Sequence, residues 1–128
     1  MEYVLISIIM LSLDSLYLSL IGQKLFNPMI NIIQKEKMSI NIHAAIITYI
    51  FLLIVLYKFI IQNNKSPNDA FLLGLCIYGV FEFTNLTIFK KYQLTPAIVD
   101  TLWGGILFYL TTYLTYKYIN YKKNNNLF

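Results

Sequence analysis

The chain has 128 residues, of which 58% are hydrophobic and only 12% are charged, a balance that excludes an ordinary water-soluble domain. The formal net charge of +4 comes from lysines that lie at the ends of apolar stretches, so attraction to lipid headgroups explains it better than binding to nucleic acid. The single cysteine, Cys76, excludes an intrachain disulfide.

Four apolar segments are each long enough to cross a bilayer as a helix, for which ~20 residues are needed. In chain order they occupy approximately residues 3–21, 42–61, 70–89 and 97–116. No segment alternates apolar and polar residues in the way that a barrel strand does. The sequence therefore predicts an all-α fold, a four-helix transmembrane bundle that forms a single integral membrane domain over residues 1–128.

The first segment is predicted to remain in the membrane as a helix. Its leading charged side chain is Glu2 rather than a lysine, and no small-x-small cleavage site follows before Lys24, which argues against a signal peptide. Further along, Asn27-Pro28 resembles a helix cap followed by a proline at the first helical position. We therefore expect a short interfacial helix between the first and second membrane spans, with an apolar face over residues 29–33.

Four spans place both chain termini on one face of the membrane, here called side A. The connections at residues 22–40 and 90–95 then lie on the opposite face, side B. Side A carries Lys58, Lys65, Lys117, Lys122 and Lys123, and side B carries Lys24, Lys35, Lys37, Lys90 and Lys91. Because five lysines stand against five, the positive-inside rule gives no orientation. The small size of the bundle favours a homo-oligomer in the lipid bilayer.

Acidic side chains lie inside three of the four apolar segments, at Asp14, Glu82 and Asp100. A charge in hydrocarbon costs ~3 kcal/mol or more and is rarely kept without a use. At ~1.5 Å per residue from the flanking lysines, the three carboxyls lie about 12–15 Å in from side B. His43 enters the second span from the same side. The sequence therefore predicts an intramembrane acidic site.

Helical spacing predicts which side chains accompany these acids, because residues three, four or seven apart share a helix face. Small residues should let the helices approach closely, and Gly79, Gly104 and Gly105 are the candidates. The predicted ion, proton or substrate site consists of Asp14, Glu82, Asn85 and Asp100, in a pocket lined by Tyr17, His43, Tyr78 and Trp103.

Three functions are compatible with this site. No lysine lies deep in a span to neutralise the acids, so at least one carboxyl should hold a proton at neutral pH. This favours proton or cation conduction, or proton-coupled transport. The alternatives are an intramembrane enzyme with isomerase-like chemistry on a lipid or sterol, in which Glu82 and Asp100 act as acid and base, and an accessory membrane subunit. The sequence does not decide among these functions, so no catalytic residue is assigned.

Neither a metal nor a cofactor is expected, because the acids and His43 show no fixed ligand spacing. The expected partners are the bilayer and either a small cation or a lipid-soluble ligand. Conduction would also require a polar route from the acids to side A. The candidates for that route are Ser7, Thr48, Gly74, Thr111 and Thr115.

Three stretches of the chain together resemble one family. They are Asp14-Ser15-Leu16-Tyr17-Leu18, Gly74-Leu75-Cys76-Ile77-Tyr78-Gly79-Val80-Phe81-Glu82-Phe83-Thr84-Asn85-Leu86 and Val99-Asp100-Thr101-Leu102-Trp103-Gly104-Gly105. They resemble the small predicted membrane proteins catalogued as domain of unknown function twenty-one seventy-seven. The pattern of that family has an aspartate near a tryptophan in helix one, a Tyr-Asp-Leu-Thr-Asn run in helix three and a Val-Asp-x-x-Trp-Gly run in helix four.

The chain departs from this family pattern at three positions. Glu82 stands at the usual aspartate, Phe81 at the usual tyrosine, and Tyr17 at the helix-one tryptophan. The resemblance implies that the acidic positions form a shared site, and it carries no established activity.

Overall fold

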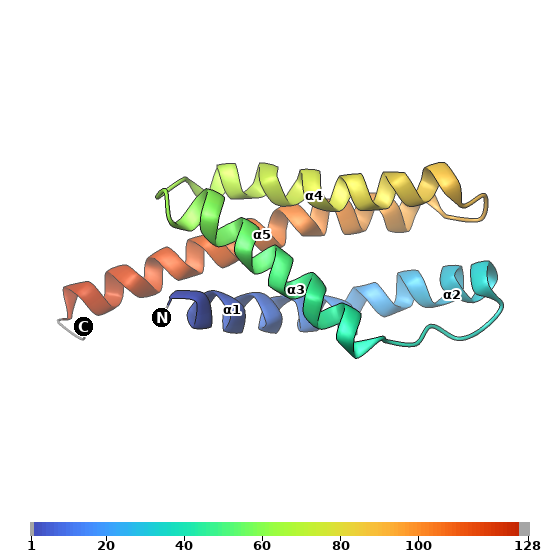
Figure 1. Cartoon of the computed structure of the whole chain (residues 1–128), viewed down its shortest axis with the longest axis horizontal. Helices are drawn as coiled ribbons and strands as arrows, with labels where there is room; N and C mark the ends of the chain where they lie inside the picture. The colour runs from blue at the N-terminus through green and yellow to red at the C-terminus, as the bar shows by residue number, and fades with distance from the viewer. Residues whose placement is uncertain (1, 126–128) are drawn as a thin grey trace.

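The computed structural model describes residues 2–125, and within this range the chain is helical with no strand (Figure 1). Four rods in the described part are long and apolar enough to cross a membrane, which confirms the predicted all-α membrane bundle. The start of α1 and the end of α5 lie at the same end of the bundle (Figure 1). The elements are α1 Glu2–Tyr17, α2 Gln23–Gln34, α3 Ile42–Leu56, α4 Pro67–Ile88 and α5 Leu94–Asn124.

The first rod is one continuous helix of 33 residues from Glu2 to Gln34. The helix expected between the first two spans is present as α2, but its expected start at Asn27-Pro28 is wrong, because it continues directly from the first span. A π-helical stretch, Leu18–Gly22, joins α1 to α2, and Pro28 lies inside α2 instead of starting it. The backbone stays helical through Pro28, although this residue cannot donate to the carbonyl of Lys24 and its ring crowds that carbonyl. At ~1.5 Å per residue the rod exceeds a ~30 Å hydrocarbon core, so it must tilt or extend into the headgroups.

Capping side chains define where the next two helices begin. Asn41 accepts a hydrogen bond from the backbone N–H of Ala44 at 3.1 Å and starts α3. The Ser66 hydroxyl accepts from the N–H of Asp69 at 3.2 Å, with Pro67 in the first turn of α4. Such caps satisfy backbone donors that have no partner within the helix. A second π-helical stretch, Tyr57–Ile61, ends the α3 rod.

Helices α4 and α5 lie side by side along most of their length, and α3 crosses the bundle obliquely (Figure 1). Small residues permit the α4–α5 approach. A Cβ atom on Gly74 would lie 2.7 Å from Cγ of Phe108, and one on Gly104 would overlap the ring of Tyr78. Gly105 is equally confined, since its Cβ would lie 2.8 Å from the Phe71 ring. In a bilayer, such close packing replaces the hydrophobic effect as the force that joins helices.

Gly79 does not contribute to this close approach, contrary to the expectation from the sequence. A Cβ atom there would only meet Cγ2 of Thr101 at 3.4 Å, which is ordinary contact. The main core lies between α1, α3, α4 and α5. Its fully buried members include Ile6, Leu56 and Phe108.

A buried network of carboxyl and aromatic groups

The carboxyl of Asp14, on α1, joins three helices. One oxygen accepts a hydrogen bond from the hydroxyl of Tyr49 on α3. The other accepts from Nε1 of Trp103 on α5 at 2.8 Å. Asp14 is 6% exposed, so both bonds are screened little by solvent. The α1 carboxyl therefore fixes the positions of α3 and α5 around it.

The carboxyl of Asp100, on α5, is linked to the same aromatic groups. Its Oδ1 accepts a hydrogen bond from the Tyr17 hydroxyl at 3.2 Å. The Tyr17 ring stacks on Trp103 with centroids 4.6 Å apart and planes 12° from parallel. Trp103 thus donates to Asp14 through its edge and packs on Tyr17 through its face. The two aspartates are therefore held by a single aromatic unit.

Glu82, on α4, is the most deeply buried of the three acids. Its Oε1 accepts a hydrogen bond from the Tyr92 hydroxyl at 2.5 Å, and Asn85 Nδ2 donates to the same hydroxyl at 3.4 Å. Its Oε2 is buried without a donor, but the Asp100 carboxyl lies within hydrogen-bonding reach. Two carboxylates can hydrogen-bond only if one carries a proton. Glu82 and Asp100 could therefore bond to each other only when one of the two carries a proton.

Tyr92 lies in the connection between α4 and α5, where it is 9% exposed. Burial raises the pKa of its phenol above the ordinary value of 10.0, and the hydrogen bond to Glu82 raises it further. The hydrogen bond from Asn85 has the opposite, smaller effect. Tyr92 is consequently a neutral donor at physiological pH, and it connects Glu82 to the side-B end of the bundle.

Every carboxyl in this network receives a hydrogen bond from a tyrosine hydroxyl. We call the whole set the acidic network. Its members, in order of contact, are Tyr49, Asp14, Trp103, Tyr17, Asp100, Glu82, Tyr92 and Asn85. Neutral phenol and indole groups donate to the acids without contributing a positive charge.

The structure brings together six of the eight side chains singled out from the sequence, namely Asp14, Tyr17, Glu82, Asn85, Asp100 and Trp103. Tyr78 lies beside them, with its ring against Gly104. His43 is exposed in the first turn of α3 and takes no part in the network. In the part of the chain that is described, no three His, Cys, Asp or Glu side chains are placed to hold a metal ion.

Two members of the network, Tyr49 and Tyr92, were missed by the sequence reasoning. Tyr49 occupies the place on the second span that His43 was expected to fill. The signal was present, because Tyr49 and Thr48 are the only polar side chains in the otherwise apolar run from residue 44 to 56. Tyr92 gave no such signal, since tyrosines near a membrane interface are common as anchors.

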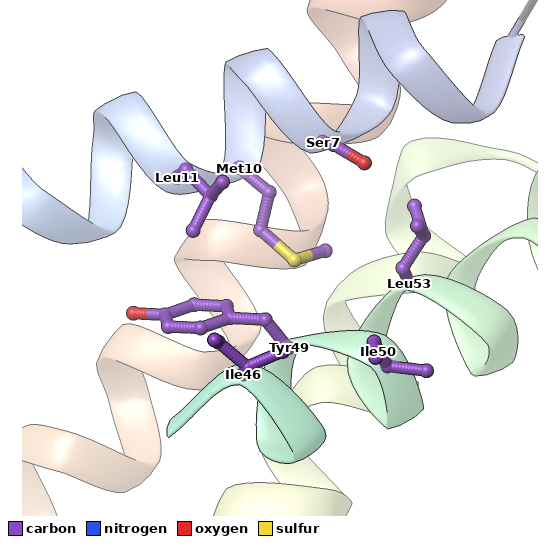
Figure 2. Close-up of a pocket in the computed structure, with 7 residues that line it drawn as sticks. All are labelled: Ser7, Met10, Leu11, Ile46, Tyr49, Ile50 and Leu53. Carbon is purple, nitrogen blue, oxygen red and sulfur yellow. The ribbon is translucent and has the colours of Figure 1, made fainter. Parts of the chain in front are cut away.

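A groove opens beside the network between α1 and α3, with a volume of about 240 Å³. Figure 2 shows Met10 and Leu11 of α1 facing Ile46 and Tyr49 of α3 across it. Ser7, Ile50 and Leu53 complete the lining. Because Leu11, Ile46 and Ile50 are also exposed on the outside of the bundle, the groove opens sideways into the membrane.

These features define a multi-pass, all-helical membrane protein with an acidic network buried among its spans. The sequence profile of a family described as predicted membrane protein (DUF2177) matches residues 1–117. The chain belongs to this family, and the match covers every residue of the acidic network. No curated protein and no solved structure matches the chain.

Proposed function

We propose that the protein carries protons through the membrane, by conduction or by proton-coupled transport, and that the acidic network is the carrier. The observation that supports this proposal is the contact of three buried carboxyls through neutral tyrosine and tryptophan donors. Because its hydrogen-bond donors are neutral, such a network can gain or lose a proton without breaking an ion pair.

The pairing of Glu82 with Asp100 supports the same proposal. An isolated carboxylate in hydrocarbon costs ~3 kcal/mol or more, whereas a proton shared with a second carboxyl avoids a second charge. Accepting or releasing that one proton changes the charge of the pair by one. Tyr92 and Asn85 extend the polar contacts from Glu82 to the α4–α5 connection, which gives the proton a route to side B.

The test is proton flux in liposomes that contain the purified protein and carry an imposed pH gradient. We expect the wild type to dissipate the gradient. Glu82→Gln should reduce the rate at least about tenfold, which corresponds to ~1.4 kcal/mol in the barrier, because an amide cannot release a proton at this position. Glu36→Gln is the matched control, since Glu36 is an exposed acid beyond the end of α2.

A second candidate function is acid/base catalysis on a lipid, and the groove between α1 and α3 favours it. An apolar cavity of ~150 Å³ already binds benzene, so a groove of about 240 Å³ can accept part of a hydrocarbon chain. Glu82 and Asp100 would act as acid and base, with Tyr49 at the groove wall. Absence of flux at every pH, together with conversion of an added lipid that is lost in Glu82→Gln, would favour this candidate over transport.

A further inference from the structure

Three threonines on α5 are fully buried and leave their hydroxyl oxygens without a hydrogen-bond partner. They are Thr111, Thr112 and Thr115, each 0% exposed. Two of them, Thr111 and Thr115, are among the residues expected from the sequence to continue a polar route to side A. We call the three the threonine cluster.

Other threonines in the bundle satisfy their hydroxyls within their own helices. Thr48 donates to the carbonyl of Ala44 at 3.0 Å, and Thr87 to the carbonyl of Phe83 at 2.8 Å. Thr101, which is on α5 itself, donates to the carbonyl of Ala97 at 2.7 Å. This is the usual solution for a helical threonine. The threonine cluster departs from it, so its hydroxyls are turned toward the interior of the bundle.

A buried hydroxyl without a partner is unfavourable by about 1–3 kcal/mol, and three at one place are unusual in a native structure. Leu107 and Phe108, on the turn of α5 that precedes the cluster, belong to the hydrophobic core. Buried polar groups that lack protein partners are commonly satisfied by internal water, which bonds to two to four polar atoms. Three hydroxyls on adjacent turns meet that requirement.

The cluster lies close to the side-A end of the bundle. The next residue after Thr115 is Tyr116, whose hydroxyl donates to the carbonyl of Lys65 at 2.7 Å. Lys65 lies in the α3–α4 connection, between Ile61 and Pro67. The turn of α5 that follows the cluster is therefore bonded to the α3–α4 connection on side A.

An apolar layer separates the threonine cluster from the acidic network. Thr111 lies eight residues beyond Trp103, or about 12 Å along α5 at 1.5 Å per residue. Leu107 and Phe108 fill the interval and are fully buried. Phe108 is held against Gly74 of α4. The polar groups on the two sides of this layer are thus kept apart by a packed barrier.

We propose that Thr111, Thr112 and Thr115 bind internal water and form the side-A half of the proton route, with Leu107 and Phe108 as the closed barrier between this water and the acidic network. This inference rests on the proposed proton transport, but its water site can be tested without any flux. The two halves of the route then differ in chemistry. Carboxyls that exchange protons lie toward side B, and hydroxyls that bind water lie toward side A.

The water site is tested by cysteine accessibility in a Cys76→Ser background, which removes the native exposed thiol. Thr111→Cys and Thr115→Cys should react with a small water-soluble methanethiosulfonate at least about tenfold faster than Leu56→Cys. Leu56 is the matched control because it is equally buried, belongs to the hydrophobic core and lies outside the threonine cluster. Reaction at the same slow rate at all three positions would overturn the water site.

The role in transport is tested by valine substitutions, which keep the shape of threonine and remove the hydroxyl. Thr111→Val and Thr115→Val should each lower proton flux about tenfold, while Thr87→Val should leave it unchanged, because that hydroxyl only bonds its own helix. Wild-type flux in both cluster variants would overturn the role of the cluster and leave proton transport intact. Accessible cysteines without flux in the wild type would instead overturn the proposed function and retain the water site.

Discussion

Trp103 links the two aspartates of the acidic network. Its Nε1 donates to Asp14, and its ring stacks on Tyr17, the donor to Asp100. A tryptophan at this position combines one polar atom with a large flat surface. The indole therefore couples the hydrogen bonding of α1 to that of α5.

Trp103→Phe separates these two contributions. Phenylalanine retains an aromatic face for Tyr17 but cannot donate, so Asp14 would keep only its bond from Tyr49. We expect the free energy of unfolding to fall by about 1–3 kcal/mol, together with a loss of proton flux. Unfolding in mixed detergent and flux in liposomes measure the two effects. Unchanged values in both assays would show that the bond from the indole to Asp14 is unimportant.

Tyr92→Phe tests the state of the phenol at the side-B end. Because burial raises the pKa of Tyr92 in the folded protein, its stabilising contribution is complete below about pH 10 and is lost as the pH rises through the higher folded-state value. The wild type should therefore lose stability above pH 10 more steeply than Tyr92→Phe. The difference between the two unfolding curves measures this. Parallel curves above pH 10 would contradict a buried neutral phenol.

At this scale, sequence reasoning located the acids and missed two of their donors. A carboxyl in an apolar run is conspicuous, because the bilayer penalises it strongly. A tyrosine in a membrane span is not conspicuous, because its ring is compatible with hydrocarbon and its hydroxyl with the interface. Tyr49 is one of two polar side chains in its apolar run, whereas only the three-dimensional contacts distinguish Tyr92 from the other tyrosines near helix ends.

At the scale of the helices, the α4–α5 pair positions Glu82 beside Asp100. The pair is close because Gly74 faces the backbone of Gly104 and the side chain of Phe108. Helix periodicity predicted which residues share a face. It could not predict the continuity of α1 with α2, because Pro28 suggested a boundary that the π-helical stretch and the intact helix around it override.

Gly74→Ala should disturb this helix pair strongly. The added methyl group would overlap the carbonyl oxygen of Gly104, and a backbone atom cannot move aside as a side chain can. We expect a loss of about 1–3 kcal/mol in stability, as for other overpacked interiors. Gly79→Ala is the matched control on the same helix, because its methyl group would make only ordinary contact with Thr101. Equal thermal stability of the two variants in detergent would refute the close approach.

At the scale of the whole molecule, the acidic network joins α1, α3, α4 and α5 at one depth, and the threonine cluster lies on the opposite side of an apolar layer. The overall bundle followed from hydropathy and helical rise. Hydropathy could not predict the oblique course of α3, which opens the lateral groove. Helix crossing angles depend on side-chain packing, which hydropathy does not describe.

The most direct test of the central claim is proton flux through liposomes that contain the wild type, Asp14→Asn, Glu82→Gln, Asp100→Asn or the double variant Glu82→Gln/Asp100→Asn. If the acids form one carrier, each single change should abolish most of the flux, and the double variant should be no worse than either of its parents, because residues that act as a unit are not additive. Wild-type flux in all three single variants would contradict the account.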